Sequence, residues 1–230
     1  MDKREIFEIL NKNYFSKECH EKELIGMLPG LLGDAGVFVD VGASLGQYTY
    51  HANKALRNGR IYAIEADPVR YEELKKNCAK WQAESTNVIT PVHAAASEGD
   101  GEISFFVTDS NVSGGLFIRG DTPASKLNWR EVTVKSLSLD SLFAEDPPDF
   151  IKIDVEGAEL KVLSGAVGIL KKSRTRFLIE VHNFPDSVNP KEVYKFMERF
   201  GYSAKNYFGR KYFVKREKRL RRLYDFLKGK

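Results

Sequence analysis

Cysteine, glutamine and long apolar runs are all scarce in this chain of 230 residues. Its two cysteines, Cys19 and Cys78, belong to no metal-type cluster, which argues against a disulfide scaffold and is typical of a reducing compartment. No apolar stretch approaches the roughly 20 residues of a membrane-spanning helix, and the charged first residues lack the apolar core of a signal peptide. We therefore expect a cytoplasmic protein with no membrane partner.

The composition indicates one folded domain with small additions at its ends. Hydrophobic residues make up 42% and charged residues 30%, which is the balance of a soluble globular protein. Positive charge is concentrated in residues 210–230, where ten Lys and Arg stand against two acidic residues. We expect a helical cap over residues 1–35, a main domain over 36–215 and a basic amphipathic helix over 216–230.

Short β-branched runs alternate with helical patterns along the main domain, which predicts an α/β fold with a doubly wound, mostly parallel sheet. An antiparallel hairpin that turns near Gly209 should complete the sheet. A polar stretch at 109–128, set between two β segments, has the length of a binding loop. The strands are expected at 37–41, 60–65, 88–94, 149–154 and 177–181, and the helices at 47–56, 68–81, 158–170 and 190–200.

The first strand ends in Asp40-Val41-Gly42-Ala43-Ser44-Leu45-Gly46, a turn suited to a ligand. Gly42 and Gly46 allow a sharp bend and a close approach of the backbone, while Asp40 can complement a cationic group. The spacing is not the Gly-x-Gly-x-x-Gly of dinucleotide sites, so a nucleoside with a positive sulfonium fits better than a pyrophosphate. Glu65 ends the next strand, where a carboxylate can accept both hydroxyls of a ribose. Because Glu65 would serve NAD equally well, a nicotinamide-dependent oxidoreductase stays open as an alternative.

Three segments, 38–49, 149–159 and 163–166, resemble the FkbM-type methyltransferases, and the likeness covers about residues 36 to 182. The resemblance implies the class I (Rossmann-like) methyltransferase fold with S-adenosyl-L-methionine as the methyl donor. It implies that a saccharide or another small molecule accepts the methyl group, often on a hydroxyl. Position 44 is Ser here where that family commonly has Asn. The cofactor contacts that we expect on this basis are Asp40, Gly42, Ser44, Gly46, Glu65, Asp154 and, near the adenine, Ala94 or Ala95.

Candidate catalytic groups follow the fourth and fifth strands: Asp154 and Glu156, then Glu180 and His182. His182 is our first choice for the general base, because imidazole accepts a proton near neutral pH. Glu159 falls in the first turn of the next helix, where interaction with the helix dipole explains it at least as well as catalysis. Several of these carboxylates could bind a divalent ion, but no His/Asp spacing compels one. We expect no required metal.

A basic surface keeps RNA methylation open as a second function. The basic residues of 210–230, together with the loop that carries Arg119 and Lys126 and the nearby Trp129 and Arg130, could bind RNA phosphates. No recognised RNA-binding motif is present. The sequence does not name the acceptor, and it leaves open whether the chain is a monomer or a homodimer.

Overall fold

The computed structural model describes residues 15, 21–108, 129–183, 189–207 and 210–215. Its main sheet has seven strands in the order β3-β2-β1-β7-β8-β10-β9. The first five of these run parallel, and β10 and β9 form an antiparallel pair at one edge, which confirms the predicted doubly wound sheet with its hairpin. The strands are β1 (Val37–Val41), β2 (Arg60–Glu65), β3 (Val88–His93), β7 (Phe150–Ile153), β8 (Arg176–Ile179), β9 (Tyr202–Tyr207) and β10 (Arg210–Lys215).

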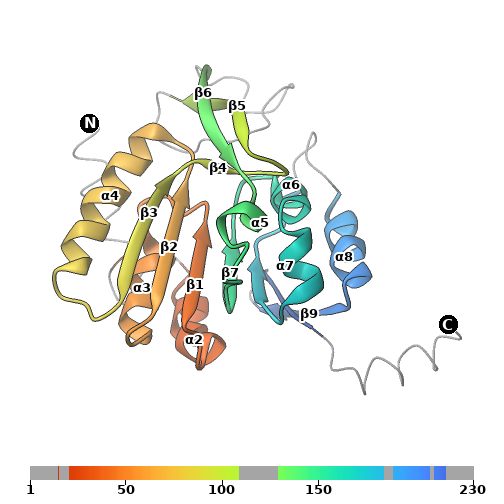
Figure 1. Cartoon of the computed structure of the whole chain (residues 1–230), viewed down its shortest axis with the longest axis horizontal. Helices are drawn as coiled ribbons and strands as arrows, with labels where there is room; N and C mark the ends of the chain where they lie inside the picture. The colour runs from red at the N-terminus through yellow and green to blue at the C-terminus, as the bar shows by residue number, and fades with distance from the viewer. Residues whose placement is uncertain (1–14, 16–20, 109–128, 184–188, 208–209, 216–230) are drawn as a thin grey trace, which may run out of the picture.

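Helices cover both faces of this sheet, as its two apolar faces require. One core cluster lies between the sheet and α2 (Lys22–Leu32), α3 (Gln47–Ala55) and α4 (Pro68–Gln82). The other lies beneath α5 (Leu139–Leu142), α6 (Glu159–Ser164), α7 (Val167–Lys172) and α8 (Pro190–Arg199). In Figure 1, α4 and α8 stand at opposite ends of the sheet. The expected helices and strands therefore occur, with ends shifted by a few residues.

The central strands alternate between the two core clusters because successive side chains point to opposite faces. Val39 and Ile151 belong to one cluster, whereas Phe38 and Phe150 belong to the other. On the face of Phe38 and Phe150, the next inward positions are Asp40 and Lys152, which are partners in the register of β1 and β7. The fold thus places one buried acid beside one buried base near the carboxyl ends of the two central strands.

The prediction of one helix over 158–170 was wrong in one respect, because the structure divides this segment into α6 and α7. Gly165 separates them, and a Cβ there would lie 1.9 Å from the carbonyl oxygen of Ser97. The Asp140 carboxylate then accepts the N–H groups of Gly168 and Ile169 at the start of α7, at 2.6 and 2.9 Å. The close packing of Gly165 therefore interrupts the helix, and the Asp140 carboxylate caps the new start at α7.

A second sheet of three strands, β4 (Ala95–Ala96), β6 (Trp129–Leu137) and β5 (Gly101–Thr108), lies beyond the ends of the central strands (Figure 1). It contains the two β segments that the sequence predicted around the polar stretch, and they pair antiparallel. The stretch 109–128 and the expected helix 216–230 lie outside the described residues, as does most of the expected cap 1–35. Among the helices that the structure does describe, none combines the length and hydrophobicity needed to cross a bilayer.

Candidate active site

In the turn after β1, every second residue has a left-handed backbone conformation. Gly42, Ser44 and Gly46 have φ angles of 73°, 52° and 93°, all in the left-handed region. Glycine adopts this region freely, and among other residues Asn tolerates it best. The backbone at position 44 would therefore suit the family's common Asn; Ser44 adopts it here and accepts a hydrogen bond from Arg70 Nη1 at 2.7 Å.

Close packing makes Gly42 the tightest point of the turn. A Cβ at this position would lie 1.8 Å from the carbonyl oxygen of Asp154. The N–H groups of Gly42 and Ala43 both donate to the carbonyl of Ile64 at 3.0 Å, which ties the turn to β2. The first turn of the sheet is therefore fixed by backbone contacts to both neighbouring strands.

The Glu65 carboxylate lies at the tip of β2 and receives backbone hydrogens from both sides. Its Oε2 accepts the N–H of Ser44 at 2.7 Å, and its Oε1 accepts the N–H of Asp67 at 2.8 Å. Burial raises the pKa of Glu65, against the lowering effects of Arg70 and these two N–H groups. A carboxylate has about four acceptor positions, so Glu65 keeps capacity for further donors such as hydroxyls.

Asp40 is fully buried below the turn. Its Oδ2 accepts the N–H and the hydroxyl of Thr49 at 3.0 and 2.8 Å. Its Oδ1 forms an ion pair with Lys152 Nζ at 3.3 Å. These contacts give Asp40 a supporting position under the turn, and direct contact with a cofactor stays a prediction.

Lys152 connects the two halves of the site. Its Nζ donates to the carbonyl of Gly42 at 3.2 Å, lies 3.5 Å from Asp154 Oδ2 and stands 4.9 Å from the centre of the Tyr48 ring. Burial alone would lower the pKa of Lys152, but Asp40 and Asp154 outweigh burial and raise it. Lys152 is thus a fixed positive charge between the turn and the acidic groups that follow β7.

One pocket opens beside this turn and gathers the expected catalytic residues. It is lined by Glu21, Gly42, Ala43, Ser44, Gln47, Tyr48, Lys152, Asp154, Glu156, Glu180, His182 and Arg210. The lining does not include Gly46, Glu65, Ala94 or Ala95, all of which the structure describes; their cofactor contacts also stay predictions. The pocket therefore lies on the side of the turn that faces β7, β8 and β10, away from Glu65.

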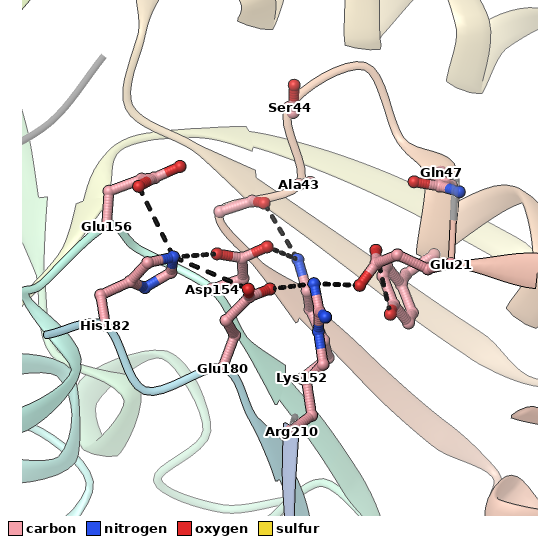
Figure 2. Close-up of a pocket in the computed structure, with 12 residues that line it drawn as sticks. Glu21, Ala43, Ser44, Gln47, Lys152, Asp154, Glu156, Glu180, His182 and Arg210 are labelled. Atoms are coloured by element: carbon pink, nitrogen blue, oxygen red, sulfur yellow. Dashed lines mark hydrogen bonds and ion pairs between the residues drawn. The ribbon is translucent and has the colours of Figure 1, made fainter. Parts of the chain in front are cut away.

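The His182 imidazole is the centre of the acidic groups, as Figure 2 shows. Its Nδ1 hydrogen is donated to Oε1 of Glu159 at 2.8 Å, and Glu159 is almost fully buried. Its Nε2 faces Glu156 Oε2 at 3.5 Å and Asp154 Oδ1 and Glu180 Oε1, each at 3.8 Å. The sequence offered interaction with the helix dipole as a reason for Glu159 at this position. In the structure, Glu159 orients the His182 ring.

Arg210 closes the other side of the pocket. Its Nη2 donates to Glu180 Oε2 at 2.6 Å and also pairs with Glu21, a residue just before α2. Glu21 accepts the Tyr48 hydroxyl at 3.3 Å as well. Arg210 and Lys215 both belong to the basic segment 210–230, yet Lys215 Nζ donates to the carbonyls of Leu170, Lys171 and Ser173. These two cations are thus engaged within the domain.

The pocket has an excess of negative charge. Its lining contains four carboxylates, from Glu21, Asp154, Glu156 and Glu180, but only Lys152 and Arg210 as permanent cations. Burial raises the pKa of Glu156 and of Glu180, and the Asp154 charge raises both further. Burial lowers the pKa of His182, but Glu159, Glu156 and Asp154 together raise it to about 9. The site therefore favours bound positive charge.

Comparison with known proteins identifies this arrangement. The model of the methyltransferase FkbM domain matches residues 40–204, which is most of the chain. The chain belongs to the FkbM methyltransferase family. It is 28% identical to the hexuronic acid methyltransferase AglP of Haloferax volcanii over 180 residues, which are 77% of this chain and 67% of that relative. This membership overturns the nicotinamide oxidoreductase alternative.

Solved structures support the fold of this methyltransferase. The FkbM methyltransferase of Methylobacillus flagellatus KT superposes with a TM-score of 0.55 and 18% identity over 79% of this chain, which spans only 44% of that longer protein. The precorrin-6y C5,15-methyltransferase of Geobacter metallireducens GS-15 gives a TM-score of 0.51 at 17% identity, over 84% of this chain and 87% of that one. The fold is that of the class I methyltransferases.

Six lining residues were absent from the predicted site, and three of them carry charge: Lys152, Glu21 and Arg210. Lys152 did carry a signal, because a lysine in the middle of an otherwise apolar buried strand needs a buried partner. Asp40 stands at the matching place on the neighbouring strand. Glu21 and Arg210 carried no such signal, since only the folded chain brings the segment before α2 next to the start of β10.

Proposed function

We propose that this methyltransferase uses S-adenosyl-L-methionine to methylate a hydroxyl of a saccharide. The observation that carries the proposal is the cluster of Asp154, Glu156, Glu180 and His182 directly beside the turn after β1, in one pocket. The relative named as a hexuronic acid methyltransferase supports the choice of a saccharide.

The residues around the turn fit the donor. The bend at Gly42 has no room for a side chain and presents backbone to the pocket, and Glu65 keeps acceptor capacity for ribose hydroxyls. The excess of carboxylates in the pocket suits a ligand that carries both a sulfonium and an ammonium group. S-adenosyl-L-methionine supplies a methyl group on a positive sulfur, activated for displacement. Gly42, Ser44, Glu65 and Asp154 would hold it.

The acidic groups after β7 and β8 suit a hydroxyl acceptor. Carboxylate oxygens accept hydrogen bonds from saccharide hydroxyls and hold the acceptor oxygen in place, which is the main requirement of an in-line displacement. When the oxygen–carbon bond forms, the carbon–sulfur bond breaks and the hydroxyl gives up its proton. The cluster around His182 lies where that proton is released, and Glu156, with 42% of its side chain exposed, faces the pocket.

The test is an assay of the full chain with the donor and three acceptors: a uronic acid oligosaccharide, a neutral saccharide of the same length and a structured RNA. Mass spectrometry of each acceptor detects the added methyl group. We expect a methyl ether on at least one of the two saccharides and none after Glu180→Gln. Methylation of the RNA alone would overturn the proposal and establish the alternative reading, which no contact among the described residues favours.

A further inference from the structure

Three side-chain atoms at the centre of the pocket are spaced as the ligands of one cation. Asp154 Oδ1 and Glu180 Oε1 each lie 3.8 Å from His182 Nε2, and the three groups offer ligand atoms within 4.8 Å of one another. A separation of 3.8 Å is too long for a hydrogen bond. Ligands about 2.1 Å from an octahedral ion lie about 3.0 Å from adjacent ligands and about 4.2 Å from opposite ones. The two separations of 3.8 Å lie between these values.

A separate contact fixes the far atom of each of these groups. His182 Nδ1 is held by Glu159, Asp154 Oδ2 lies next to Lys152, and Glu180 Oε2 is held by Arg210. Each group is anchored through one atom and turns its other atom toward the common centre. Figure 2 shows how Asp154, Glu180 and His182 face one another. A histidine that binds a metal usually donates its other ring N–H to a carboxylate or a carbonyl, as His182 does to Glu159.

We propose that Asp154, Glu180 and His182 form a divalent-cation site. Two oxygens and one imidazole nitrogen, without a thiolate, suit Mn²⁺ or Mg²⁺, and Mn²⁺ accepts both ligand types readily. The sequence led us to expect no metal, because residues 154, 180 and 182 show no metal-type spacing. The parallel pairing of β7 and β8 brings them together.

The role of the cation rests on the proposed function, whereas its binding does not. Three protein ligands leave coordination positions that face the pocket, and saccharide hydroxyl oxygens are suitable ligands for them. A cation bound to the acceptor oxygen would fix its position and favour loss of its proton. Glu156, on the pocket side of His182, would then accept that proton.

The test measures binding of Mn²⁺ to the full chain, by electron paramagnetic resonance of the free ion, with S-adenosylhomocysteine present at saturation. We expect one Mn²⁺ per chain. Asp154→Asn and Glu180→Gln should each weaken binding by at least about 10-fold, and Glu159→Gln, which disturbs the orientation of His182, by about 10-fold. Glu98→Gln removes an exposed carboxylate outside the pocket and is the matched control, for which unchanged binding is expected.

Circular dichroism shows whether each variant keeps its fold, and the affinity for S-adenosylhomocysteine shows whether Glu180→Gln and Glu159→Gln keep the donor site. Absence of a stoichiometric site in the wild type would overturn the proposal, as would equal loss of Mn²⁺ in Glu98→Gln and Glu180→Gln. Full methylation of the saccharide in excess chelator would refute the role of the cation while leaving the proposed function intact. Mn²⁺ binding without methylation of any saccharide would leave the cation site intact and refute the proposed function.

Discussion

The two sides of the site are built in different ways. On the side of β1 and β2, Glu65 is held by backbone N–H groups, and the turn is tied to the carbonyl of Ile64. On the side of β7, β8 and β10, carboxylates are held by cationic side chains from distant segments, as Glu180 is by Arg210. In the proposed function, the first side is a backbone cradle for a constant donor. The second is a surface of side chains, which can change with the acceptor while the backbone stays the same.

Lys152 contacts both sides, through Gly42 and Asp154. Variants of the two sides should therefore behave differently. Those on the acceptor side should lose turnover and keep donor affinity, whereas those on the donor side should lose donor affinity or stability.

The largest effect is expected for His182→Ala. The ring is the centre of the acceptor-side cluster, so turnover should fall by about 1,000-fold, within the range for loss of a group that assists proton transfer. Calorimetry with S-adenosylhomocysteine should give an affinity within about twofold of wild type. A parallel loss of donor affinity would show that the two sides are not separable.

Gly42→Ala is the strongest test of the donor-side cradle. The new Cβ would clash with the carbonyl of Asp154, and alanine is strained at a φ of 73°. We expect a loss of about 3 kcal/mol in the free energy of unfolding, measured in urea. Gly26→Ala in α2 is the matched control, because its Cβ meets nothing within 4 Å; it should gain up to about 1 kcal/mol. Similar behaviour of the two variants would contradict the packing argument.

Glu65→Ala should weaken the binding of S-adenosylhomocysteine by about 30-fold, because hydrogen bonds to a charged group are worth about 1.5–3 kcal/mol. Calorimetry measures the loss. Glu180→Gln is the comparison variant from the acceptor side and should bind almost as tightly as wild type. An unchanged affinity in Glu65→Ala would remove the ribose role of Glu65 and with it the donor-side assignment.

The smallest effect is expected for Ser44→Asn. Asn tolerates the left-handed backbone at position 44 better than Ser, and its side-chain oxygen can replace the Ser44 hydroxyl as the acceptor for Arg70. We expect a gain of about 0.5 kcal/mol in the free energy of unfolding by thermal and urea denaturation. A loss of stability would mean that the Arg70 contact, and not the backbone, decides the residue at this position.

Most of the fold was predictable because it follows local patterns. The β-branched strands, the glycine turn and Pro68 at the start of α4 each act over a few residues, and all were placed correctly. The division of α6 from α7 was not predictable, since it depends on the approach of Ser97 to Gly165 across 68 residues. Local preference for a helix is weak compared with such a contact.

The sequence by itself determined the family, the alternation of strands and helices along the chain, and the set of Asp154, Glu156, Glu180 and His182, because each of these follows from local sequence patterns. Only the tertiary structure decided that Asp40 is a buried support, that Glu159 orients His182, and that Glu21, Lys152 and Arg210 complete the pocket. The physical reason is that charge pairing acts through space, between side chains that the chain order keeps far apart.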